Sequence, residues 1–188
     1  LNTGKTEHET QTSNVLALYF NLTDNPEREA EKLVKDIEEC GHLKTGFVGT
    51  PYLLHTLTKI GRTDLAYKLL FKKDFPSWLF PVTRGATTMW ERWDGMKEDG
   101  SFATPEMNSF NHYAYGSVQE WMYRYMAGIE TDGVAFRNIL LQPRVDTRTD
   151  DELPEGQQRM KWVRCSYNSV AGLIESNWSN EENFIYEC

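Results

Sequence analysis

The chain has 188 residues and a formal net charge of −8. This length allows one domain, or one domain with part of another, and 39% hydrophobic with 26% charged residues is ordinary globular usage that argues against disorder. A nucleic-acid partner is disfavoured, because binding a phosphate backbone requires clustered Lys and Arg, and the densest cationic stretch is the short run from Lys68 to Lys73. No apolar run approaches the roughly 20 residues that span a bilayer, so we expect no membrane partner.

The thiols and imidazoles form no recognisable metal or redox motif. Cys40, Cys165 and Cys188 are widely spaced and odd in number, which favours a reduced compartment or indifferent thiols over a disulfide framework. The four His residues show no metal-ligand spacing. We therefore expect neither a metal site nor a cofactor, and the compartment stays open because the sequence contains no signal peptide.

Helical periodicity dominates the first 130 residues. Six helices are predicted: five over 11–22, 26–40, 51–60, 64–73 and 113–126, and one that starts within 86–93. The second segment has the clearest end signals, with Asn25 as N-cap, Pro26 at the first helical position and Gly41 after the last turn. Short turns marked by Gly or Pro would join the helices into three hairpins. Three hairpins are half of a six-hairpin toroid, although a helical bundle would give the same count.

Beyond Gly128 the pattern changes to alternation of apolar and polar residues. Strands are predicted at 136–145, 160–168 and 172–178, with a polar loop over 146–158 and a hairpin turn from Asn168 to Gly172. We therefore divide the chain into a helical domain, 1–130, and a β domain, 131–188. Three or four strands would leave unpaired edges, and the sequence opens without an initiating Met, so we expect a fragment of a longer protein.

The segment from Gly85 to Gly95, GATTMWERWDG, holds the strongest chemical signal. It places Glu91 between Trp90 and Trp93. Sugar faces stack on indole rings, while carboxylates act on the anomeric carbon or its attacking water, so this combination suits a glycosidase cleft. The same spacing also fits a capping box from Thr88 to Glu91, in which the glutamate only satisfies backbone at a helix start. Spacing alone leaves both hypotheses open.

Two further residues have a functional and a structural interpretation. His112, at a loop-to-helix junction, would either donate a hydrogen bond to a sugar hydroxyl or bond to the backbone at the helix start. Trp78, on a Pro-bounded loop, would either line a cleft or fill the space between hairpins. The segment from Gly46 to Pro51 lacks the Lys and the Gly spacing of a phosphate-binding loop. Its glycines are interpreted as letting the backbone pass close to another hairpin.

Four blocks occur together in a fixed order. They are TGFVGTPYLLHTL at 45–57, GRTDLAYKLL at 61–70, FPSWLFPVTRGATTMWERWDG at 75–95 and SFNHYAYGSVQEWMYRYMAGI at 109–129. The set resembles the C-terminal half of the catalytic domain of the α-L-rhamnosidases, from about Gln11 to Ile129, and the resemblance continues weakly into the β region. It implies a mainly α fold: half of an (α/α)6 six-hairpin toroid, followed by a partial antiparallel β-sandwich.

The resemblance also implies an activity and its residues. That family hydrolyses terminal α-L-rhamnose with inversion, using two carboxylates and no redox cofactor, so the implied partner is a rhamnose-containing glycoside or polysaccharide. Glu91 matches the proposed general base and His112 a sugar-contacting residue. Trp78, Trp90 and Trp93 fall on aromatic positions near the cleft. The general acid belongs to an earlier acidic motif that nothing in the sequence matches.

Two expectations follow from the missing acid and the missing half of the toroid. Inverting hydrolysis requires both carboxylates, so the isolated chain should be inactive. Inward-facing helices would remain unburied, so the rest of the parent polypeptide or a second copy should cover them. The alternatives are another inverting glycosidase of the same helical fold, a glycoside phosphorylase, and a non-catalytic carbohydrate-binding fragment. A phosphorylase would require a basic phosphate pocket, and only Arg84 and Arg92 lie near Glu91 in the sequence.

Overall fold

The structure is a computed structural model that describes residues 9–97, 99–154 and 157–188. It contains two compact units, Leu1–Val118 and Gln119–Cys188. We name them the helical unit and the β unit, and each is described by itself.

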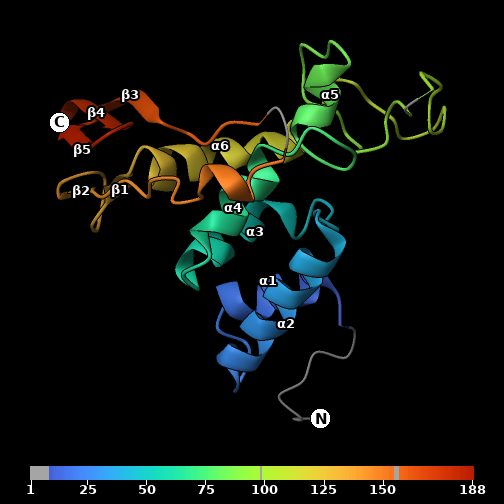
Figure 1. Ribbon diagram of the computed structural model, residues 1–188, viewed down its shortest axis with the longest axis horizontal. Helices are drawn as coiled ribbons and strands as arrows, with labels where there is room; N and C mark the ends of the chain where they lie inside the picture. Colours follow the sequence, from blue (N-terminus) through green and yellow to red (C-terminus); the bar gives the residue numbers. More distant parts are fainter. Residues whose placement is uncertain (1–8, 98, 155–156) are drawn as a thin grey trace. The chain divides into compact units, whose positions relative to one another are not determined.

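The first helical pair consists of α1 (Gln11–Tyr19) and α2 (Pro26–Cys40), drawn in blue in Figure 1. The predicted ends of α2 are confirmed, since Asn25 accepts a hydrogen bond from the backbone N–H of Arg28 and Gly41 adopts φ 70°. In contrast, α1 stops three residues before its predicted end at residue 22. Asn21 has φ 54°, a left-handed conformation that a right-handed helix does not continue through.

The second pair consists of α3 (Thr50–Lys59) and α4 (Thr63–Leu70), joined by a turn at Gly61 with φ 81°. The N-cap of α4 is Arg62, which makes no side-chain capping hydrogen bond. Asp64, in the first turn, accepts two hydrogen bonds from Arg62, from Nε at 3.0 Å and from Nη2 at 2.8 Å. Fully buried side chains from all four helices form the core: Val15, Leu33, Ile37, Leu53, Leu57, Tyr67 and Leu69.

The chain between residues 75 and 117 differs most from expectation. A short helix, α5 (Leu79–Thr83), occupies part of the predicted loop, whereas no helix starts within 86–93, where one was predicted to begin. The reason is that residues 89–91 pair with a distant segment of the same chain, residues 109–112. Glu91 N donates to Ser109 O at 2.9 Å and His112 N donates to Met89 O at 2.8 Å, so these segments use their backbone groups on each other.

The predicted helix over 113–126 is present as three consecutive pieces. A 3₁₀ turn, η1 (Ala114–Ser117), precedes α6 (Val118–Trp121) and a π-helical turn, η2 (Met122–Met126). The boundary between the two units falls inside α6.

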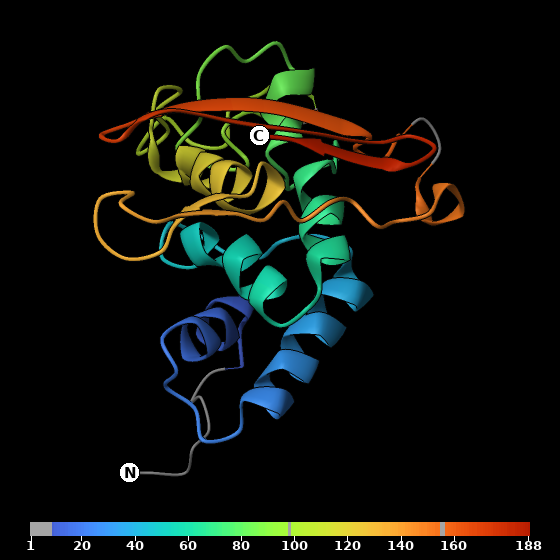
Figure 2. The same cartoon turned by 90° about the vertical axis from the view of Figure 1, so that its left-hand side faces the viewer.

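The β unit contains two small antiparallel sheets (Figure 2). Its strands are β1 (Ile129–Thr131), β2 (Ile139–Leu141), β3 (Trp162–Ser169), β4 (Gly172–Asn180) and β5 (Phe184–Glu187), with a 3₁₀ turn, η3 (Asp150–Glu152), before β3. β1 pairs with β2, and the other three follow the order β3-β4-β5. The predicted hairpin is confirmed, with Ser169 opposite Gly172 at its turn. β1 and β5 were not predicted, and β2 is shorter than its predicted range.

An apolar layer lies between the two sheets. Ala127, Ile129 and Ile174 are buried, and Phe136, Leu141, Val163 and Cys165 pack against them. Two side-chain hydrogen bonds tie β4 to the residues after α6, because Ser176 Oγ donates to Ala127 O at 2.5 Å and Trp178 Nε1 donates to Met126 O at 2.8 Å. The β region is therefore a small two-layered antiparallel structure, as predicted.

The helical unit leaves several large apolar side chains exposed, namely Phe20, Leu22, Val48, Val82, Phe102 and Met107. Within the described ranges, every helix is too short or too polar to cross a membrane. The same ranges contain no group of three or more His, Cys, Asp or Glu side chains arranged to hold a metal ion.

Candidate functional site

A cleft of about 560 Å³ opens in the helical unit, within the range of roughly 300–1,000 Å³ that ligand pockets occupy. One side of it is formed by residues 42–47, which follow α2, and another by residues 91–94. Phe75, Pro76, Met107 and Tyr115 complete the lining. Glu91 and Trp93, both predicted as site residues, are therefore part of the same cavity.

Glu91 is half-buried and is fixed by one neighbouring segment. Ser109 N donates to Glu91 Oε2 at 2.8 Å, in addition to the backbone hydrogen bond in the opposite direction. The capping-box hypothesis is wrong, because no helix starts at this point. The hydroxyl of Thr88, which would have been the cap, donates instead to Phe110 O. The carboxylate therefore has no role at a helix start.

A second carboxylate in the lining, Asp94, is bound by Arg92. Arg92 Nε donates to Asp94 Oδ1 at 2.9 Å and Nη2 donates to Oδ2 at 3.2 Å, a two-point contact. These hydrogen bonds from Arg92 hold the pKa of Asp94 below its ordinary value and raise the pKa of Arg92. Asp94 is thus an anion already paired with Arg92, whereas among the described residues the Glu91 carboxylate accepts a hydrogen bond from the Ser109 amide alone.

The aromatic wall of the cleft is a stack centred on Trp93. Its ring lies parallel to Tyr115, with centroids 3.8 Å apart and an interplanar angle of 9°, and its Nε1 donates to Thr45 O at 2.9 Å. Burial raises the pKa of the Tyr115 hydroxyl. Trp78 stands edge-on behind Trp93 at 5.5 Å, is 4% exposed and donates through Nε1 to Tyr115 O at 3.0 Å. Trp78 fills space behind the wall and does not belong to the lining.

Trp90 is likewise buried, at 4% exposure, and lies outside the lining. Its ring meets Phe110 edge-on, with centroids 5.0 Å apart. The loop that follows is held by Asn108, whose Nδ2 donates to Gly95 O at 2.9 Å. Trp90 therefore packs the Glu91 segment against Phe110.

His112 is half-buried and adjoins the cleft through Phe47, which is part of the lining. The two rings are parallel, with centroids 4.9 Å apart and an interplanar angle of 5°. Ala114 N donates to His112 Nδ1 at 3.3 Å, so Nδ1 is an acceptor and we assign the proton of the neutral ring to Nε2. Nδ1 thus bonds to the backbone at the helix start, as the structural interpretation of this histidine expected. Nε2 is the nitrogen that has a proton to donate.

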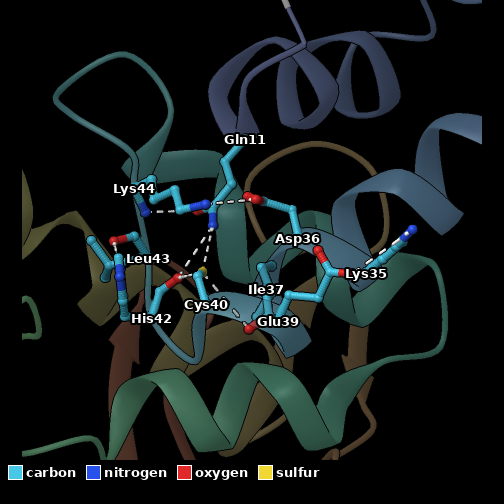
Figure 3. A network of polar contacts seen from close by, with 9 residues as sticks. All are labelled: Gln11, Lys35, Asp36, Ile37, Glu39, Cys40, His42, Leu43 and Lys44. Atoms are coloured by element: carbon cyan, nitrogen blue, oxygen red, sulfur yellow. Dashed lines mark hydrogen bonds and ion pairs between the residues drawn. The ribbon is translucent and has the colours of Figure 1, made fainter.

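Residues 42–44 were not recognised from the sequence as part of the site, and Figure 3 shows what positions them. Gln11, buried in α1, accepts a hydrogen bond from Lys44 N at 2.7 Å and donates through Nε2 to His42 O at 3.2 Å. Lys44 Nζ forms an ion pair with Asp36 at 2.6 Å. Because these contacts span about thirty positions in sequence, no local pattern could have revealed them.

The cationic side chains that line the cleft test the alternative hypothesis that the protein is a glycoside phosphorylase, which would need to bind phosphate. Lys44 and Arg92 both line the cavity, but each is engaged by a carboxylate, Asp36 and Asp94 respectively. A phosphate would have to displace these carboxylates, so the arrangement is poorly suited to phosphate.

Two domain families match consecutive parts of the sequence. Residues 1–126 match the bacterial alpha-L-rhamnosidase 6 hairpin glycosidase domain, and residues 128–187 match the bacterial alpha-L-rhamnosidase C-terminal domain. The chain belongs to the bacterial α-L-rhamnosidase family. The fold expected from the resemblance is thereby confirmed: part of a six-hairpin glycosidase domain followed by the C-terminal domain of the same family. The predicted boundary between residues 130 and 131 stays a prediction.

Individual family members support the same assignment. An α-L-rhamnosidase of Streptomyces avermitilis is 44% identical over 189 residues, covering 98% of this chain and 17% of the relative. The crystal structure of the Streptomyces avermitilis enzyme complexed with L-rhamnose gives a TM-score of 0.87 at 42% identity, over 99% of this chain and 18% of that chain. The crystal structure of native α-L-rhamnosidase from Aspergillus terreus gives a TM-score of 0.85 at 33% identity. The match covers 99% of this chain and 21% of that chain. The chain thus spans about a fifth or less of these enzymes.

Proposed function

We propose that this chain is the part of an inverting α-L-rhamnosidase that supplies the general base, Glu91. The proposal is supported by the difference between the two carboxylates of the cleft. Asp94 is engaged at both oxygens by Arg92, whereas Glu91 is held at Oε2 by the Ser109 amide. Among the described residues, Oε1 of Glu91 has no hydrogen bond or ion pair, so its lone pairs remain to accept a proton from water.

In the proposed reaction, Glu91 accepts a proton from a water molecule as the water oxygen forms a bond to the anomeric carbon of rhamnose. The glycosidic C–O bond breaks, and the departing oxygen takes a proton from a general acid in another part of the polypeptide. Attack opposite the leaving group inverts the anomeric configuration. The room for that water requires the two carboxyl groups to stand roughly 6.5–9.5 Å apart.

The binding roles follow from exposure and hydrogen bonding. Nε2–H of His112 would donate to a sugar hydroxyl, and the edge of the Trp93 stack would give the sugar an apolar surface. Trp78 and Trp90, predicted as sugar contacts, take a supporting role in this proposal because both are 4% exposed. A rhamnose-containing glycoside or polysaccharide is the proposed substrate, in keeping with the L-rhamnose bound to the Streptomyces avermitilis relative.

Two properties of the isolated chain form part of the proposal. It should lack turnover, because the described residues that line the cleft include two carboxylates, Glu91 and Asp94, and Asp94 is paired with Arg92. Its exposed apolar side chains in the helical unit should be covered by the remainder of the polypeptide or by a second copy.

The deciding experiment is E91Q in the full-length polypeptide that contains this chain. Glutamine keeps the hydrogen bond from Ser109 N but cannot take a proton from water, so we expect turnover of an aryl α-L-rhamnoside to fall by several orders of magnitude with folding retained. E120Q, at an exposed glutamate of α6, is the matched control and should leave turnover unchanged. Wild-type turnover in E91Q would overturn the assignment of the base.

Two further measurements test the rest of the proposal. Proton spectra recorded early in the reaction should show the inverted anomer of rhamnose first. The chain alone, assayed on the same aryl glycoside, should show no turnover, and light scattering should show association. A monodisperse and active chain would contradict both expectations.

A further inference from the structure

The sheet of β3, β4 and β5 has one polar face and one apolar face. Side chains directly opposite each other in the register point to the same side, and so do alternate residues along a strand. Ile174, Ser176 and Trp178 of β4 share one face and are 7%, 0% and 3% exposed. The other face, here named the outer face, carries Trp162, Arg164, Ser166 and Asn168 of β3, Leu173, Glu175, Asn177 and Ser179 of β4, and Ile185 and Glu187 of β5.

The outer face is built as a solvent-facing surface. In an antiparallel sheet, a face that packs into a core carries apolar side chains, and a face toward water carries polar ones. Most outer-face residues are polar, but Trp162, Leu173 and Ile185 stand among them with 58%, 62% and 57% of their surfaces exposed. An indole exposed to this extent contributes little to the core.

The indole borders a hollow in the outer face. A depression of about 450 Å³ is lined by residues that include Trp162, Arg164, Asn177, Ser179, Ile185 and Glu187. The guanidinium carbon of Arg164 lies over the Trp162 ring, 5.9 Å from its centre, in a cation–π arrangement. The exposed part of the ring thus adjoins donors on Arg164 and Asn177 and acceptors on Asn177 and Glu187. This is the combination that a polyol with one apolar face requires.

The charges restrict the ligand further. The lining of the hollow includes two carboxylates, Glu181 and Glu187, and one cation, Arg164. This net negative lining disfavours a phosphate or a uronate, whereas neutral hydroxyl groups can donate to the carboxylates. A ligand without charge is therefore favoured over an anionic one.

We infer that the outer face of β3-β4-β5 is a binding site for a neutral pyranose sugar, with Trp162 as the stacking platform and Arg164, Asn177 and Glu187 as hydrogen-bonding partners. The site lies in the β unit and involves none of the residues of the Glu91 cleft. Its test is therefore independent of the test of the proposed hydrolysis. Its role would be to hold a carbohydrate chain by a sugar unit that is not being cleaved.

The test is titration of the ¹⁵N-labelled full chain with methyl α-L-rhamnopyranoside. The indole N–H signal of Trp162 is assigned from its loss in W162F. We expect saturable shifts of this signal and of the Asn177 side-chain amide in the millimolar range, which is the affinity of a shallow one-ring site. Galacturonic acid, a uronate, should shift them less at the same concentration.

Two variants separate binding from folding. W162A should abolish the shift of the Asn177 amide, while F184A, on the opposite face of the same sheet and 53% exposed, should keep it. The indole signal of the buried Trp178 reports whether either variant remains folded. E91Q should leave the titration unchanged.

Three results would overturn the inference. The first is an absence of shifts at Trp162 and Asn177, and the second is a shift of Asn177 that persists in folded W162A. The third is a Trp162 signal that moves with protein concentration in sugar-free buffer, which would identify the outer face as a contact between copies of the chain. A stronger effect of galacturonic acid would contradict the preference for a neutral ligand.

Discussion

Glu91 and Ser109 hold each other by two hydrogen bonds, one from Glu91 N to Ser109 O at 2.9 Å and one from Ser109 N to Glu91 Oε2 at 2.8 Å. The first fixes the backbone of residue 91 and the second fixes its carboxylate. The donor of the second bond is a backbone amide, so the position of the carboxylate does not depend on the rotamer of another side chain. The geometry is that of a group placed before its substrate arrives.

This anchoring predicts how a shortened side chain behaves. E91D retains the carboxylate but removes one methylene group, so the acid cannot keep both its place in the cleft and the hydrogen bond from Ser109. We expect kcat of the full-length enzyme to fall about 100-fold, the typical effect of a displacement near 1 Å, with KM little changed. E120D serves as the control. An E91D enzyme with wild-type kcat would show that the position of this carboxylate does not matter.

The ion pair of Arg92 and Asp94 predicts a pH dependence. Hydrogen bonds from Arg92 hold the pKa of Asp94 below its ordinary value of 3.8. A carboxyl whose pKa is lower in the folded state stabilises the fold above its unfolded pKa, and that contribution is lost as the pH falls through the folded pKa. At neutral pH the contribution is complete, and it should disappear below about pH 4.

D94N should therefore be less stable than the wild type at neutral pH, and the difference should shrink as the solution is acidified. Urea unfolding from pH 7 to pH 3 measures it, and D132N, at an exposed aspartate, is the control. A difference in unfolding free energy that stays constant over this range would contradict the lowered pKa.

The elements that the sequence predicted well are those with signals at both ends. α2 was located by Asn25, Pro26 and Gly41, and the β3-β4 hairpin by its alternation and turn, because each signal acts within a few residues. The helix expected to begin within 86–93 fails for the opposite reason. Its residues have helical spacing, but their backbone groups pair with residues 109–112, and no local pattern reports a partner some twenty positions away.

In the candidate site, too, the residues marked by a local pattern were predicted and those brought in by distant contacts were not. Glu91 and Trp93 were found because charge and aromatic rings are concentrated in one short segment, whereas Lys44 and Phe47 come to the cleft through Gln11 and the turn before α3. Trp78 and Trp90 were indistinguishable from Trp93 in the sequence, since all three are indoles near Glu91. Only the packing separates the ring that lines the cleft from the two behind it.

The turn before α3 contains a glycine that the packing requires. A Cβ at Gly49 would lie 2.8 Å from Thr12 Oγ1 in α1 and 3.0 Å from Thr45 Cγ2. The interpretation that a glycine here lets the backbone pass close to another hairpin is confirmed for Gly49, whereas nothing lies within 4 Å of a Cβ at Gly46. The backbone of Gly49 has φ −96°, so the restriction is steric contact alone.

We expect G49A to lower the free energy of unfolding by about 1–3 kcal/mol, the usual cost of forcing extra volume into a packed site. G46A is the matched control, and it should be neutral or stabilising by up to about 1 kcal/mol through the unfolded chain. Urea titrations of the two variants measure the contrast. Equal stabilities would show that Thr12 and Thr45 move aside without cost.

The long connection between β2 and β3 is held by a buried ion pair. Asp146 is 0% exposed and accepts hydrogen bonds from Arg148 N at 3.2 Å, Arg148 Nε at 2.9 Å, Arg148 Nη2 at 2.7 Å and Met160 N at 3.0 Å. One carboxylate thus closes the loop from residue 146 to residue 160, immediately before β3. Arg148 is itself only 5% exposed, so removing Asp146 takes away the carboxylate that accepts hydrogen bonds from Nε and Nη2 of a buried guanidinium.

D146A should therefore destabilise the chain by about 3–5 kcal/mol, the range for breaking one side of a buried pair, while D132A should have little effect. The double variant D146L/R148M removes both charges and should recover much of the loss, since apolar replacement of a complete pair is often close to neutral. Met160 N loses its acceptor in both variants, so recovery should stop short of the wild type. Urea unfolding followed by tryptophan fluorescence measures the free energy of unfolding of the wild type and of the three variants. If D146A unfolds within about 1 kcal/mol of the wild type, the loop is held by its other contacts and the ion pair is dispensable.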